Sequence, residues 1–157
     1  MKTTHGFTLI ELLVTLVLVG LVASISVPLY EVTSTRLHEA ELRAALRQIR
    51  TAIDAYKAAA DSGLIAKTVT ESGYPPSLEV LVQGIETQNV ADARRVVFLR
   101  QVPRDPFCFE EATPPAQHWA IRSYGSPPDD PRPGNDVYDV ASRSTRVGLN
   151  GVPYQEW

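Results

Sequence analysis

The sequence predicts an α+β fold, in which one long N-terminal helix packs against a small, loop-rich head that holds an antiparallel sheet. The first observation is an apolar run from Phe7 to Tyr30, whose only charged residue is Glu11. The second is a helical spacing of apolar residues after Tyr30. The third is that most of the 12 prolines and 9 glycines fall in the second half of the chain, between short alternating stretches that are typical of strands.

The apolar run is long enough to cross a membrane. As a helix rising ~1.5 Å per residue, residues 7–30 would span about 36 Å, against roughly 30 Å for the hydrocarbon core. Lys2 and the starting amine precede the run, which favours a cytoplasmic N-terminus. We therefore expect a single-pass transmembrane helix, with a kink or local melting near residues 24–28 caused by Pro28. The alternative is a secretory signal peptide, although Glu11 lies within its apolar core.

The helix is predicted to continue as an amphipathic segment over residues 31–61. Its apolar side chains recur at steps of four and three residues and form one stripe: Leu42, Leu46, Ile49, Ile53, Tyr56 and Ala60. We expect one helix from about Phe7 to Ala60, ended by Asp61-Ser62-Gly63 with Gly63 as a left-handed cap. The stripe packs on the head or, as the alternative, on a coiled-coil partner.

Charged side chains of this segment are predicted to face solvent. Glu39 precedes Arg43 by four residues, which is the favourable order for a surface ion pair on a helix. Arg43, Arg47 and Arg50 form a row that is either a solvated helix face or a surface for lipid phosphates or a neighbour's acidic groups.

The head, residues 62–157, is predicted to begin with a loop and a short helix. The helix runs from Leu78 to Val82, with Ser77 as its N-cap and Gly84 as its stop.

The sheet of the head is predicted further along the chain. One strand covers His118 to Tyr124, with Trp119, Ile121 and Ser123 on one face, and its partner covers Val137 to Ala141. Asn150-Gly151 is a strong two-residue turn signal, so Val152 to Trp157 is expected to return against the sheet, with Trp157 as a packing residue.

An acidic, proline-rich segment, residues 126–136, joins the two predicted strands. Calcium prefers oxygen ligands, and the candidate ligands in and just after this segment are Asp129, Asp130, Asn135, Asp136 and Asp139. Four prolines in the segment restrict φ and oppose the folding back that such a site requires. Two interpretations stay open: a calcium loop, or a solvated loop in which Asp136 and Asp139 cap turns or pair with arginines.

Composition argues against several classes of function. The formal net charge of −3, with mixed signs, gives no basic surface for nucleic acid. The single cysteine, Cys108, cannot form an internal disulfide. Motifs for nucleophilic, phosphate-binding or redox chemistry are missing, and both His38 and His118 are predicted to lie at the surface. We therefore expect no enzyme; the rival is a membrane-tethered periplasmic enzyme that uses His118 and the acidic loop.

The string Gly6-Phe7-Thr8-Leu9-Ile10-Glu11 resembles the processing site of type IV pilins and of the pseudopilins of type II secretion. The resemblance implies a pilin-like fold and a leader, residues 1–6, that a prepilin peptidase removes before it methylates Phe7. It also implies that subunits stack into a helical filament. There, the Glu11 carboxylate would pair with the Phe7 amine of an adjacent subunit.

Two stretches of the head, residues 73–81 and 98–107, look like the major, G-type pseudopilin. This resemblance implies a structural subunit of a periplasmic pseudopilus, stored in the bacterial inner membrane with its head in the periplasm. The implied partners are further copies of itself, the prepilin peptidase, an inner-membrane platform protein, minor pseudopilins, membrane lipid and, indirectly, an assembly ATPase. A type IV pilus subunit is the alternative.

Major pseudopilins typically bind calcium in the corresponding C-terminal loop, and the resemblance would place that site at Asp129, Asp130, Asp136 and Asp139. This sequence departs from the pattern, because prolines stand where the family loop is rich in glycine. Cys108 also stands where the family commonly has glycine. We therefore expect that the head requires no cofactor.

Overall fold

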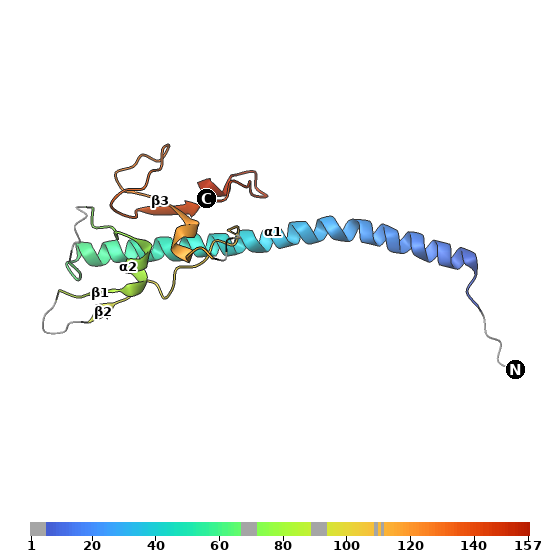
Figure 1. Cartoon of the computed structure of the whole chain (residues 1–157), viewed down its shortest axis with the longest axis horizontal. Helices are drawn as coiled ribbons and strands as arrows, with labels where there is room; N and C mark the ends of the chain where they lie inside the picture. The colour runs from blue at the N-terminus through green and yellow to red at the C-terminus, as the bar shows by residue number, and fades with distance from the viewer. Residues whose placement is uncertain (1–5, 67–71, 89–93, 109, 111) are drawn as a thin grey trace. The chain divides into compact units, whose positions relative to one another are not determined.

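The computed structural model describes residues 6–66, 72–88, 94–108, 110 and 112–157. The elements, in chain order, are α1 (Leu9–Asp61), α2 (Leu78–Gln83), β1 (Ile85–Glu86), β2 (Arg95–Val96), η2 (Pro115–His118), β3 (Trp119–Arg122), β4 (Asp139–Ser142) and η3 (Tyr154–Glu156) (Figure 1). The chain divides into two compact units, Met1–Leu37 and His38–Trp157. The long helix and the short antiparallel strands confirm the predicted α+β, pilin-like fold.

Helix α1 is the single long helix that the sequence predicts. Its 53 residues continue without interruption through residues 24–28, so the local melting expected there was wrong. Gly63 ends the helix with φ +72°, in the left-handed conformation that glycine adopts without a steric penalty. The Gly63 and Leu64 amides donate to the Ala60 and Ala59 carbonyls, which satisfies two of the last carbonyl groups of the helix.

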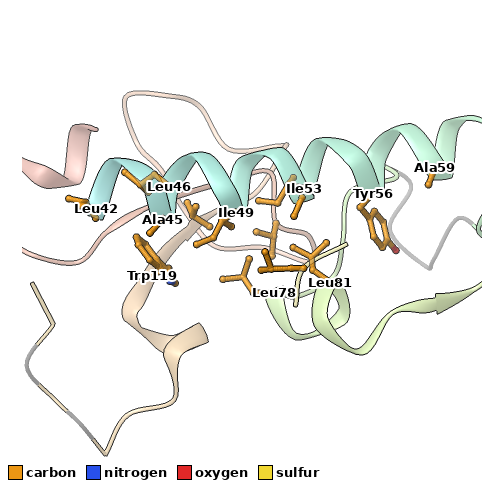
Figure 2. Close-up of a cluster of buried hydrophobic side chains, with 14 of the residues drawn as sticks. Leu42, Ala45, Leu46, Ile49, Ile53, Tyr56, Ala59, Leu78, Leu81 and Trp119 are labelled. Atoms are coloured by element: carbon orange, nitrogen blue, oxygen red, sulfur yellow. The ribbon is translucent and has the colours of Figure 1, made fainter. Parts of the chain in front are cut away.

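The apolar stripe of α1 forms one side of the core, as predicted. All six of its predicted members are at most 2% exposed: Leu42, Leu46, Ile49, Ile53, Tyr56 and Ala60. Figure 2 shows Leu42, Leu46, Ile49, Ile53 and Tyr56 beside Trp119 of β3 and Leu78 and Leu81 of α2, which are also fully buried. Each large apolar side chain that leaves water contributes about 1.5–3 kcal/mol, so this stripe is the main attachment of the head to α1.

Strands β3 and β4 confirm the predicted antiparallel pair, with shorter and slightly shifted bounds. Trp119 pairs with Ser142 and Ile121 with Val140, and these four side chains lie on the core side of the sheet. The strand begins one residue later than expected, because His118 belongs to the 3₁₀ helix η2.

The turn at Asn150-Gly151 occurs as predicted, but the returning strand does not. Gly151 has φ +81°, and a single bridge joins Val147 and Pro153. The chain then forms the 3₁₀ helix η3, with Pro153 as its N-cap residue. Trp157 packs against Tyr154, with ring centroids 4.9 Å apart, which supports the expected packing role.

Helix α2 forms where it was predicted and ends at Gly84. Ser77 precedes it with extended backbone, but its side chain makes no capping hydrogen bond, so that detail was wrong. The two-stranded hairpin β1–β2, with Ile85 opposite Val96 and Glu86 opposite Arg95, was not predicted. Two residues per strand are too few to produce a readable alternation.

Candidate functional site

The segment before α1 presents an accessible peptide bond. Gly6 and Phe7 precede the first helical residue, and Phe7 is 87% exposed. A Cβ added to Gly6 would meet no atom within 4 Å. The rest of the predicted leader lies outside the described residues. The Gly6–Phe7 bond therefore stands in non-helical chain, where a peptidase can reach it.

Thr8 and Glu11 close the N-terminus of α1 reciprocally. The Glu11 amide donates to Thr8 Oγ1 at 3.3 Å, and Glu11 Oε2 accepts from the Thr8 amide at 2.9 Å and the Thr8 hydroxyl at 3.0 Å. This arrangement is a capping box, and it places the carboxylate at the positive end of the helix dipole. Thr8 was missed as a site residue, although a threonine three residues before a glutamate is the sequence signal for this cap.

The helix that follows this cap is apolar on all sides. Every residue from Leu9 to Ser24 is exposed in the isolated chain. A helix without a polar face needs an apolar environment, either lipid or neighbouring helices. In length and composition this part of α1 can cross a membrane. The cap therefore lies at the N-terminal end of a helical segment that is suited to lipid or to packing against other copies.

The candidate calcium ligands do not converge in the head. Asp136, at 6% exposure, accepts hydrogen bonds from the Ser72 hydroxyl, from the Ser123 hydroxyl at 2.6 Å and from the Tyr124 amide at 2.9 Å. Burial acts to raise the pKa of this carboxyl, but the three hydrogen bonds together outweigh it and hold the pKa below its usual value. Asp136 is thus held as a carboxylate by neutral donors.

The other acidic residues of the set face different neighbours. Asp139 lies between two arginines, with Arg50 Nε at 2.8 Å from Oδ1 and Arg122 Nη2 at 3.4 Å from Oδ2. Asp129 and Asn135 are exposed, and Asp130 pairs with Arg132 at 2.5 Å. Across the described ranges, no three His, Cys, Asp or Glu side chains gather closely enough to hold a metal ion. As arranged, these residues do not fit a calcium site.

The three arginines of the predicted row line one surface concavity, but two of them also contact other groups of the head. Arg43 lies over the Trp157 ring, 4.1 Å from its centroid, and contacts Glu39 at 3.4 Å. Arg50 turns toward β4, while Arg47 stays exposed. The predicted ion pair between Glu39 and Arg43 forms. Glu39 is only 4% exposed, however, so the prediction that this residue lies at the surface was wrong.

The two histidines and the cysteine have different surroundings. His118 is 1% exposed, which contradicts the surface position predicted for it, and its Nε2 lies 3.0 Å from the Thr113 carbonyl oxygen. His38 is half-buried, with its ring edge-on to Phe107. Cys108 is a free thiol of intermediate exposure.

Comparison with known families supports the N-terminal assignment. Residues 1–27 match the model of the prokaryotic N-terminal methylation motif. No curated protein and no solved structure matches the chain. The motif match covers the leader, the cap and the apolar half of α1, and it supports a type IV pilin-like, membrane-anchored subunit that a prepilin peptidase processes.

Proposed function

We propose that this chain is the major structural subunit of a periplasmic pseudopilus that drives protein export by type II secretion. Its work is mechanical: subunits stored in the bacterial inner membrane are added to the base of a filament, which lengthens and pushes cargo outward. Support for polymerisation comes from the methylation motif at residues 1–27 together with the exposed apolar half of α1. Support for a pseudopilus over a type IV pilus comes from the likeness of residues 73–81 and 98–107 to the G-type subunit.

The observation that carries this proposal is the capping box at Thr8 and Glu11. A carboxylate at membrane depth is costly unless it has partners. In the separate subunit the Thr8 amide and hydroxyl serve as those partners. Cleavage after Gly6 would create an ammonium group on Phe7, and in a filament the Phe7 of an adjacent subunit could approach the same carboxylate. The Glu11 carboxylate would then exchange the neutral donors of Thr8 for the charged ammonium of Phe7. At low dielectric a charged donor binds a carboxylate more strongly than a neutral one does, which favours the assembled state.

The proposed partners follow from this cycle. A prepilin peptidase cuts after Gly6 and methylates Phe7. A platform protein in the inner membrane receives the subunit, an assembly ATPase on the cytoplasmic side supplies the work, and minor pseudopilins begin the filament. The N-terminus would face the cytoplasm and the head the periplasm.

The test combines microscopy with mass spectrometry and secretion. The chain is overexpressed with its secretion genes, filaments are sheared and imaged, and the mass of the filament subunit is measured. We expect filaments made of a chain that begins at N-methyl-Phe7, and loss of exported enzymes when the gene is deleted. Filaments with unimpaired secretion after deletion would instead assign the chain to a type IV pilus. A processed chain that forms no filaments would overturn the structural role.

A further inference from the structure

The guanidinium group of Arg50 joins three separate parts of the head. Its Nε donates to Asp139 Oδ1 at 2.8 Å, and its Nη2 donates to the Val140 carbonyl at 3.0 Å and to the Trp157 backbone oxygen at 2.7 Å. These oxygens belong to β4 and to the residue that follows η3, while Arg50 belongs to α1. One cation therefore binds three oxygens from segments that lie 89 to 107 residues away along the chain.

The same contacts leave Asp139 little capacity for a metal ion. Its Oδ1 also accepts the Val140 amide at 2.8 Å, and its Oδ2 faces Arg122. Asp136, the most buried acid of the candidate calcium set, is directed to Ser72, Ser123 and the Tyr124 amide. Two positive charges already compensate Asp139, so a divalent ion placed there would meet electrostatic repulsion.

We infer that Arg50 is the cation that holds these segments of the head together, and that it replaces the calcium ion implied by the family resemblance. A guanidinium is charged at every physiological pH and offers donors in a fixed planar fork, so it can hold a carboxylate and two carbonyls together. Because it is covalently part of α1, its occupancy does not depend on the concentration of a free ion, as the occupancy of a metal site does. The head closes on α1 without a divalent cation. This inference does not depend on the filament role.

The test measures the melting of the full-length chain in detergent. Both tryptophans of the sequence, Trp119 and Trp157, lie in the head, so their fluorescence reports head unfolding without interference from the apolar helix. We expect the same Tm in millimolar calcium and in excess chelator. A large drop in Tm with chelator would return the loop to a calcium role and overturn the inference. This comparison needs no variant to fold.

Variants at position 50 test the cation directly. Arg50→Met keeps most of the stem but leaves the three oxygens without their donor, and we expect Tm to fall by roughly 5–10 °C. Arg47→Met is the matched control, because Arg47 lies on the same helix, is exposed and makes no ion pair within the described residues. Arg50→Lys should recover part of the loss, since it restores the charge but not the fork. Equal Tm for the two Met variants would show that the cation is dispensable and overturn the inference.

Discussion

The hydroxyl of Tyr154 donates a hydrogen bond to Glu39 Oε1 at 3.2 Å, although 115 residues separate the two along the chain. The same oxygen accepts the Leu149 amide at 2.6 Å. Burial and the neighbouring Glu39 carboxylate raise the pKa of the Tyr154 hydroxyl, which therefore stays a donor well into the alkaline range. A charged group of α1 thus attaches the last segment of the head to the helix.

Replacement of Glu39 by alanine is expected to destabilise the head strongly. The Leu149 amide and the Tyr154 hydroxyl would both lose their acceptor, at a cost of about 2–4 kcal/mol in the free energy of unfolding. Glu41→Ala is the matched control, because Glu41 lies two residues away on the same helix and is exposed. Urea titration followed by tryptophan fluorescence measures both variants. Equal stability of the two would contradict a structural role for the buried carboxylate.

Gly84→Ala should cost more stability than Gly63→Ala, although both glycines have φ above +70°. A positive φ costs a residue with a Cβ about 1–2 kcal/mol at Gly63, and at Gly84, where ψ is 164°, the backbone lies in a region that essentially only glycine adopts. At Gly84 the new Cβ would also lie 2.7 Å from the Val96 carbonyl oxygen, while at Gly63 it would meet nothing within 4 Å. Overpacking against backbone adds roughly 1–3 kcal/mol at position 84 only. Thermal unfolding compares the two variants, and similar losses would contradict the close approach of β2.

The head is expected to lose stability in acid because of the hydrogen-bonded carboxylate of Asp136. Because hydrogen bonds lower its pKa in the folded head, the unfolded chain binds a proton first as the pH falls. Its contribution is therefore complete above the unfolded value of about 3.9 and disappears as the pH falls through the lower folded value. Asp136→Asn should flatten the pH dependence of Tm below about pH 4, whereas Asp129→Asn, at an exposed position of the same loop, should leave it intact. If Tm depends on pH in the same way in Asp136→Asn and in the unaltered chain, this role of Asp136 is contradicted.

Processing is expected to depend on the absence of a side chain at Gly6. The mature chain should begin at N-methyl-Phe7, and a bulky residue such as leucine at position 6 should leave the leader attached. Mass spectrometry of the membrane-bound chain reads both outcomes. An N-terminus after Ser24 or Ser26 would instead restore the signal-peptide interpretation.

Glu11→Ala should still insert and be cut, but it should assemble slowly or poorly, because the Phe7 ammonium of a neighbour would have no carboxylate to meet. Thr8→Val removes the hydroxyl of the capping box but leaves that carboxylate in place. We expect it to affect assembly less than Glu11→Ala does. Filament length and number per cell, from electron micrographs, measure both. Normal filaments from Glu11→Ala would show that the pairing is dispensable.

Local patterns predicted the parts of the fold that local physics decides. The stripe from Leu42 to Ala60 became the core side of α1, because the spacing of apolar residues determines which helix face leaves water. Gly63, Gly84 and Gly151 ended or turned the chain where expected, each with a positive φ. The processing string was likewise readable, since it lies within six consecutive residues, whereas its Thr8 cap was missed although it lies in the same string.

Contacts between distant residues could not be predicted in the same way. Glu39 and Arg50 carry the same charges as ordinary surface residues of a helix, and only the arrival of residues 139–157 turns them into buried or bridging groups. His118 was expected at the surface because a short segment gives no sign of what will cover it. The hairpin β1–β2 was missed for a related reason, since its register depends on chain beyond Gly84 and not on its own pattern.

The attachment of the last segment to α1 has a consequence for the order in which the protein is made. Synthesis produces Glu39 110 residues before Leu149, and Arg50 107 residues before Trp157. During that interval Glu39 and Arg50 lack the C-terminal groups that they contact in the finished head. Residues 147–157 therefore complete the head, and a nascent chain that still lacks them holds an unfinished core.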